Sequence, residues 1–141
     1  MRRRIAPVGL FLLLLPPALG AAEWKVSIRE FDVPTASSRP HDPEVAPDGS
    51  LWYTGQLANK MGRLDPRTGT IKEFALPKAD SGPHGLAAGK DGNIWFTANS
   101  AAYIGKLDPL TGKVTEYAMP DSRARDPHSL AFDPEGTIFF T

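Results

Sequence analysis

The chain has 141 residues, with 16 basic and 16 acidic side chains and no cysteine. The absence of cysteine excludes a disulfide framework and a thiolate metal site. Residues 1–22 hold three arginines and no acid, so the remainder has 13 basic and 16 acidic residues. A mildly acidic chain argues against binding to nucleic acid or to an anionic membrane surface.

The N-terminal 22 residues have the three regions of a secretory signal peptide. The basic start MRRR precedes an apolar run from Val8 to Leu15, and small residues follow up to Gly20 and Ala22. The apolar run is much shorter than the about 20 residues of a membrane-spanning helix. We therefore expect cleavage after Gly20 or, preferably, Ala22, and a secreted or periplasmic protein with no membrane association after cleavage.

The rest of the chain repeats with a period of 43 or 44 residues. Each unit contains a Pro-His pair, an Asp-Gly or Glu-Gly turn and an aromatic strand that ends in Thr. The pair recurs at 40–41, 83–84 and 127–128, the turn at 48–49, 91–92 and 135–136, and the strand at 52–54, 95–97 and 139–141. In addition, MGRLDPRTGTIKEFALP at 61–77 matches IGKLDPLTGKVTEYAMP at 104–120. A fixed period of this size predicts a repeat architecture.

Each unit carries the signals of four short strands. In the second unit a small apolar segment leads to the GKDGN turn, the strand NIWFT, the strand YIGKLD, the DPLTG turn and the alternating strand KVTEYAMP. A helical hairpin repeat is disfavoured because the 3.6-residue apolar spacing is missing and Gly-containing turns interrupt every candidate helix. The predicted fold is all-β, a β-propeller of four-stranded blades.

By the repeats, residues 23–141 contain two complete blades and parts of two others. Residues 40–77 and 83–120 are predicted to be complete blades and 127–141 the first two strands of another, while 24–34 resembles the end of a unit and is predicted to be the last strand of the closing blade. A propeller closes on itself and so protects its sheet edges. We therefore expect these residues, about two and a half blades, to be the N-terminal part of a longer protein. A short solenoid-like protein is the alternative.

All three histidines, His41, His84 and His128, occupy the same position before the first strand of a unit. That strand is the innermost strand of a propeller blade, so we expect the histidines to line the mouth of the central channel. An imidazole titrates near neutral pH and can act as a general base, a general acid or a metal ligand. The alternative is a consensus histidine that caps the inner strand by a hydrogen bond to the neighbouring blade.

Acidic residues at nearby positions can supply oxygen ligands or orient an imidazole. They are Asp42, Glu44 and Asp126. Asp126 lies two residues before His128 and is the candidate metal ligand.

Aromatic residues at the middle of the second strand are expected in the blade core and not on a ligand platform. They are Trp52, Trp95 and, in the third copy, Phe139. The Asp-Pro-x-Thr-Gly turns are expected to be surface hairpins.

The motifs PHGLAAGKDGNIWFT and IGKLDPLTGKVTEYAMP resemble the repeats of the streptogramin lyases, the virginiamycin B lyase family, over residues 24–141. The resemblance implies a seven-bladed propeller that opens a cyclic depsipeptide by elimination across its ester linkage, helped by Mg²⁺ and by His and Glu residues at the channel mouth. By motif position, His84 and His128 stand where family histidines stand, and Asp126 where an acid precedes such a histidine. Gly55 and Ala98 replace the acidic residue that often follows the Trp-Phe-Thr strand in the family.

The leading hypothesis is an exported lyase, a monomer at full length, with a small-molecule or peptide ligand at the channel mouth and Mg²⁺ as a cofactor. Two other functions stay open. One is a non-catalytic propeller that binds a peptide or glycan in the cell envelope, and the other is a lactonase-type hydrolase that uses a divalent cation and carboxylates.

Overall fold

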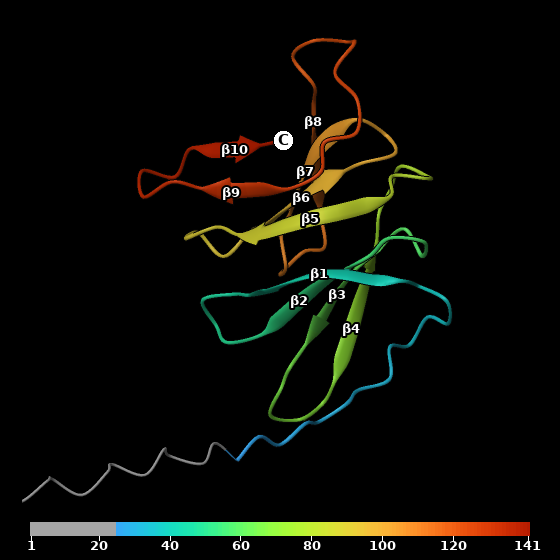
Figure 1. The fold of residues 1–141 in the computed structure, drawn as a ribbon, viewed down its shortest axis with the longest axis vertical. Coiled ribbons are helices and arrows are strands. Elements are labelled where there is room, and N and C mark those ends of the chain that lie inside the picture. The colour runs from blue at the N-terminus through green and yellow to red at the C-terminus, as the bar shows by residue number, and fades with distance from the viewer. Residues whose placement is uncertain (1–24) are drawn as a thin grey trace, which may run out of the picture. The chain divides into compact units, whose positions relative to one another are not determined.

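The protein is described by a computed structural model over residues 25–141, so the signal peptide predicted for residues 1–22 lies outside the described residues. The chain divides into two units, Met1–Glu30 and Phe31–Thr141, and all strands of the described residues belong to the second unit. Figure 1 shows this unit as antiparallel sheets without helices. No helix of the described part is long and apolar enough to cross a membrane.

Two four-stranded sheets and one two-stranded sheet make up the second unit. The first sheet contains β1 (Pro40–Val45), β2 (Leu51–Gly55), β3 (Lys60–Leu64) and β4 (Ile71–Ala75) in that order. The second sheet contains β5 (Pro83–Ala88), β6 (Ile94–Ala98), β7 (Tyr103–Leu107) and β8 (Val114–Ala118) in the same order. The third sheet pairs β9 (Leu130–Phe132) with β10 (Ile138–Phe140). The predicted all-β fold of four-stranded antiparallel units is confirmed.

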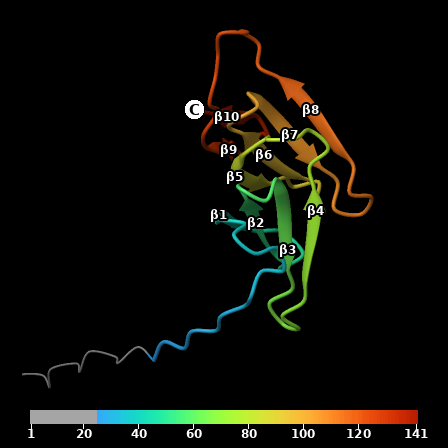
Figure 2. The same cartoon turned by 90° about the vertical axis from the view of Figure 1, so that its right-hand side faces the viewer.

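The innermost strands β1, β5 and β9 lie next to one another, and each sheet extends outward from this row. Strand β5 contacts β1 on one side and β9 on the other, as Figure 1 shows. In Figure 2 the successive strands of each four-stranded sheet step away from the row towards the outermost strands β4 and β8. This is the radial arrangement of neighbouring propeller blades.

Residues 25–33 carry no strand in the described structure, and the strand predicted over residues 24–34 as part of the closing blade stays a prediction. A strand persists only when its backbone groups pair with a neighbour, and no strand of the described part pairs with this segment. The following residues are held by a side chain instead. The Glu73 carboxylate accepts hydrogen bonds from the backbone N–H of Thr35 (3.2 Å) and from the Thr35 hydroxyl (2.5 Å). It also forms an ion pair with Lys60 Nζ (2.8 Å).

The core lies between the first and second sheets. Met61, Ile94, Phe96 and Leu107 are fully buried there. Trp52 is 1% exposed, stacks on Phe74 with ring centroids 5.3 Å apart, and donates its indole N–H to Ser50 Oγ. The sequence places these apolar residues on the faces of the sheets that meet, which is the burial that stabilises the repeat.

The prediction that the second-strand aromatic residues belong to the blade core is confirmed for Trp52 and only partly for the others. Trp95 is half-buried between the Tyr117 ring, 5.4 Å away by ring centroids, and the Phe132 ring at 6.2 Å. Phe139 is 61% exposed, so the prediction is wrong for this residue. The reason is that only two strands of the third sheet are present to cover it.

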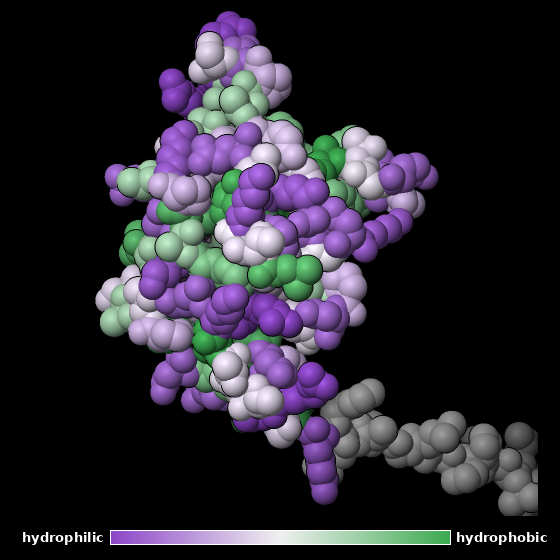
Figure 3. All heavy atoms as spheres, turned by 180° about the vertical axis from the view of Figure 1, so that it is seen from behind, coloured by the Kyte–Doolittle hydropathy of each residue, from purple (hydrophilic) through white to green (hydrophobic). Residues whose placement is uncertain are grey.

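The remaining surface is mixed in polarity. Figure 3 shows hydrophobic patches between hydrophilic side chains on the face seen from behind. Exposed large apolar residues of the described part include Val45, Leu110, Phe139 and Phe140. Such single exposed apolar side chains are normal for a folded domain.

A glycine in the third strand of each complete sheet makes room for an aromatic ring. Gly62 lies directly opposite Tyr53, and Gly105 directly opposite Phe96. A Cβ atom at either glycine would overlap the opposing ring. In each complete sheet the aromatic ring in the middle of the second strand packs on the glycine backbone of the third strand. This explains why Trp-Tyr-Thr is followed by Met-Gly-Arg-Leu, and Trp-Phe-Thr by Ile-Gly-Lys-Leu.

We predict that Gly105→Ala lowers the free energy of unfolding by about 1–3 kcal/mol, because the added methyl group forces the buried Phe96 ring out of its place. Urea denaturation measures the change. Combining Gly105→Ala with Phe96→Leu tests the cause, since the loss should be smaller than the sum of the two single losses by at least about 0.5 kcal/mol. Additive losses would contradict this packing argument.

Candidate functional site

The histidines lie where each innermost strand begins. His41 and His84 are the second residues of β1 and β5, and His128 lies two residues before β9. The register of β1 with β2 shifts between Pro40 and Pro43, and that of β5 with β6 between Pro83 and Leu86. Irregularities of this kind re-aim side chains at sheet ends, and here each one spans the histidine.

The threonine one residue before the end of the second strand of each complete sheet binds the histidine backbone of the next sheet. The Thr54 hydroxyl donates to the His84 carbonyl oxygen (2.9 Å), and the Thr97 hydroxyl donates to that of His128 (2.7 Å). Thr97 Oγ1 also accepts the Gly85 N–H at 2.8 Å. Both threonines are fully buried. Sequence reasoning did not assign them a role, although the recurrence of Thr at this position was the available signal.

The structure brings the three predicted imidazoles into one column. The His84 ring lies between the other two, with its centroid 4.0 Å from that of His41 and 3.9 Å from that of His128. The ring planes are tilted by 47° and 44°. The side chains therefore share one location, as the repeat predicted, although they come from three different sheets.

The side-chain bonds of His41 and His128 give no support to the alternative of a histidine cap, whereas the His84 side chain interacts with the His128 backbone of the next unit. His41 Nδ1 lies 2.8 Å from Asp42 Oδ1, and His128 Nδ1 lies 3.2 Å from Ser129 Oγ. Both partners belong to the same unit as the histidine. The threonine bonds between sheets use the histidine carbonyl groups, which any residue offers, so these bonds do not explain why the side chain is imidazole.

His84 is the buried member of the column. It is 8% exposed, and its Nδ1 atom is buried without a hydrogen-bond partner among the described residues. Burial lowers the pKa of His84 below its ordinary 6.5, and positive charge on His41 and on His128 would lower it further. The Asp42 carboxylate acts in the opposite direction without reversing the shift. The lowered pKa of His84 favours the neutral form of its ring at pH 7.

One of the three candidate acids joins the column, and it is Asp42 and not Asp126, the candidate metal ligand. His41, Asp42 and His84 each offer a ligand atom, and these atoms lie within 4.8 Å of one another. Asp126, the predicted metal ligand, is exposed with φ +53° and is not part of this group. Glu44 is also outside the group and pairs in register with Trp52.

The position of Asp42 is occupied by a different residue in each unit. Gly85 and Ser129 are its equivalents. A Cβ atom at Gly85 would overlap the His128 carbonyl oxygen, and the Gly85 N–H donates to that oxygen at 3.0 Å. We call the contact between two neighbouring sheets a seam. In the seam between the second and third sheets, the backbones of Gly85 and His128 are in direct contact. The first unit has the Asp42 carboxylate at the same position.

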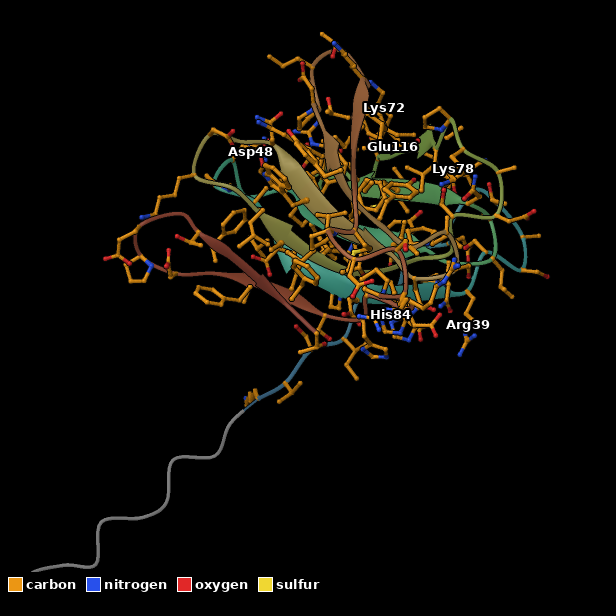
Figure 4. The ribbon with its side chains drawn as sticks, turned by 90° about the horizontal axis from the view of Figure 1, so that it is seen from above. Arg39, Asp48, Lys72, Lys78, His84 and Glu116 are labelled. Carbon is orange, nitrogen blue, oxygen red and sulfur yellow. The ribbon has the colours of Figure 1, made fainter. Side chains whose placement is uncertain are left out.

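Two grooves lie at the Asp-Gly turns, at the other end of the inner strands. One of about 570 Å³ is lined by residues that include Trp52 and Asp91, and one of about 600 Å³ by residues that include Trp95 and Glu135. No histidine of the described part lines either groove. Figure 4 shows His84 well apart from Asp48, which stands at the first of these turns. The grooves are thus separate from the imidazole column.

Comparison with known proteins connects this geometry to a family. The model of the virginiamycin B lyase family matches residues 17–141. The chain belongs to the virginiamycin B lyase family. A comparison with curated proteins finds no match.

Among solved structures, virginiamycin B lyase from Staphylococcus aureus is similar with a TM-score of 0.75 and 34% sequence identity. The match covers 82% of this chain and 38% of that chain, so this chain spans less than half the length of that relative. A second structure of the S. aureus protein, a catalytically inactive variant in which a histidine is replaced by alanine, contains quinupristin and matches at 33% identity with the same TM-score of 0.75 and the same coverage of 82% and 38%.

More distant structures share the fold alone. A gluconolactonase from Xanthomonas campestris has a TM-score of 0.62 at 15% identity, over 74% of this chain and 35% of that chain. The extracellular domain of a protein from B. thetaiotaomicron has a TM-score of 0.54 at 17% identity, over 74% of this chain and 14% of that chain. The family match and these neighbours confirm the predicted β-propeller architecture.

We predict that Thr97→Val lowers the free energy of unfolding by about 1–2 kcal/mol, because valine has the shape of threonine but forms neither buried hydrogen bond. Thermal and urea denaturation measure the loss. The matched control is Thr115→Val on the exposed strand β8, which should change stability by no more than about 0.5 kcal/mol. Equal effects at both positions would contradict the role of the seam.

We predict that His84 titrates below 6.5 in the folded protein. The unfolded chain then binds more protons between the folded pKa and 6.5, so the contribution of His84 to stability is complete above this window and is lost as the pH falls through it. NMR titration resolves His84 from His41 and His128, the neighbouring titratable rings, and from the charge of Asp42. A His84 pKa at or above 6.5 would refute the prediction.

Proposed function

We propose that the chain forms part of the channel mouth of an exported lyase that opens a cyclic ester or depsipeptide by β-elimination. The observation that carries this proposal is the column of three imidazoles in a chain of the virginiamycin B lyase family. The signal-peptide pattern of residues 1–22 supports export to the periplasm or the medium. The ligand is a small molecule or peptide, and the full-length protein acts as a monomer.

The proposed reaction requires a base that is neutral near pH 7. The base takes the proton from the carbon next to a carbonyl group, the electron pair of that C–H bond forms a carbon–carbon double bond, and the C–O bond of the ester breaks as the carboxylate leaves. The proton ends on the imidazole. Neutral imidazole is suited to this step because its pKa is near the working pH.

The three histidines differ in what they can do in this reaction. His41 is half-buried and His128 is exposed, so their rings can touch a ligand. His84 is buried between them and contacts both rings. We assign His41 and His128 as candidate proton acceptors and His84 as a positioning residue.

The donor set of the column does not fit Mg²⁺. Magnesium prefers an octahedron of oxygen ligands, and the group of His41, Asp42 and His84 offers a single carboxylate and two imidazoles. No step of the proposed reaction is therefore assigned to Mg²⁺ at these residues. A requirement for Mg²⁺, as the family resemblance implies, stays a prediction for the full-length protein.

We predict that the full-length protein converts quinupristin, the compound in the S. aureus relative's structure, into a linear product of unchanged mass with a new double bond. His128→Ala and His41→Ala should each lower kcat/KM, and the one that removes the base should lower it by about 100-fold or more. Asp126→Asn is the control, because Asp126 is exposed and outside the group. Liquid chromatography with mass spectrometry follows substrate and product.

Other outcomes would replace this proposal. A product heavier by one water would identify a hydrolase of the lactonase type, and binding without conversion, unchanged in a chelator, would identify a non-catalytic binding propeller. Full activity in both histidine variants would remove the column from the reaction. Loss of activity in a chelator, with recovery on adding Mg²⁺, is the result expected for a magnesium-assisted lyase.

A further inference from the structure

We propose that His41, Asp42 and His84 bind one divalent transition-metal ion of the zinc, nickel or copper(II) class. One ligand atom from each residue lies within 4.8 Å of the others. The three residues come from strands β1 and β5, so the ion would bridge the first and second sheets. The site requires no catalysis and therefore does not depend on the proposed lyase reaction.

The first argument is an unsatisfied buried nitrogen. His84 is 8% exposed, and its Nδ1 atom is buried with no hydrogen-bond partner among the described residues. Buried polar atoms nearly always have a partner, and an exception calls for an explanation such as an ion. A metal ion beside His84 would use the lone pair that no donor of the described part satisfies.

The second argument is the spacing of the neighbouring donors. His41 Nδ1 and Asp42 Oδ1 are 2.8 Å apart, as a hydrogen bond that shares one proton. Two ligand atoms of a tetrahedral ion with bonds of about 2.1 Å are about 3.4 Å apart. An ion can therefore replace that proton if these two atoms move apart by about 0.6 Å and the His84 ligand atom, which lies within 4.8 Å of both, joins them. The rings of His41 and His84 have centroids 4.0 Å apart, and a nitrogen of each belongs to the group whose ligand atoms lie within 4.8 Å of one another.

The third argument is the chemistry of the ligand set. Two imidazole nitrogens and one carboxylate oxygen suit zinc, nickel and copper(II), whereas Mg²⁺ and Ca²⁺ require mainly oxygen. Three protein ligands also leave a coordination position open for water or a ligand. This ligand set should therefore bind zinc, nickel or copper(II) in preference to Mg²⁺.

The fourth argument is that Asp42 departs from the repeat. The same position carries Gly85 in the second unit and Ser129 in the third. The second imidazole pair, His84 with His128, has almost the same ring separation (3.9 Å) as the first. The seam with the carboxylate forms the candidate metal group, and the seam without it does not.

The repeat supplies a matched set of variants for the test. Asp42→Gly converts the first unit to the Pro-His-Gly of the second, and His84→Ala removes the buried ligand. His128→Ala removes an imidazole of the same column that is outside the metal group, and Asp126→Asn removes an exposed acid outside it. Circular dichroism checks that each full-length variant is folded, and Asp42→Gly carries the test if His84→Ala does not fold.

Zn²⁺ is titrated into the metal-free full-length protein in competition with a chromogenic chelator, and Co²⁺ reports the ligand geometry by its visible spectrum. We expect one Zn²⁺ equivalent that is lost or weakened at least about tenfold in Asp42→Gly and His84→Ala and unchanged within about threefold in His128→Ala and Asp126→Asn. Mg²⁺ should not compete. The proposal is overturned if wild type binds no Zn²⁺, if Asp42→Gly binds as wild type does, if His128→Ala is weakened as much as Asp42→Gly, or if Mg²⁺ displaces Zn²⁺.

Discussion

The structure depends on the hydrogen bond from a buried threonine hydroxyl to the histidine carbonyl of the next sheet. Thr54 and Thr97 each make this bond, at 2.9 Å and 2.7 Å. A buried hydroxyl without a hydrogen-bond partner would lower the stability of the fold. The bond therefore sets the distance between two neighbouring sheets and their relative position along the strands. The start of each inner strand is thereby held against the start of the next.

The imidazole column follows from this seam. Because the Thr54 and Thr97 bonds hold the histidine backbones of successive sheets in place, the side chains of His41, His84 and His128 are stacked at about 4 Å. Stacking encloses the middle ring, which explains both the burial of His84 and its lowered pKa. A group that is neutral, buried and short of a hydrogen-bond partner is thus a product of the packing between sheets.

The family membership and the residues around Asp42 raise two different questions, one about elimination and one about ion binding. The family and the column support a base for elimination, which is a matter of proton transfer. Asp42 bears on the second question, which is ion binding. It places a carboxylate beside the imidazoles of His41 and His84, where the second unit has Gly85. The equivalent positions of the other two units carry Gly85 and Ser129, which offer no carboxylate.

The sequence alone determined the strands, their turns and the shared position of the histidines, because these depend on local patterns repeated every 43 or 44 residues. It could not determine that Asp42 and not Asp126 joins the column, since the direction of a side chain at a sheet end depends on the strand irregularity and on the neighbouring sheet. Nor could it show that Phe139 is exposed, because the burial of this ring depends on which strands are present to cover it. Only the tertiary structure decided these points, because contacts between repeats are set by packing across sheets and not by the pattern within one repeat.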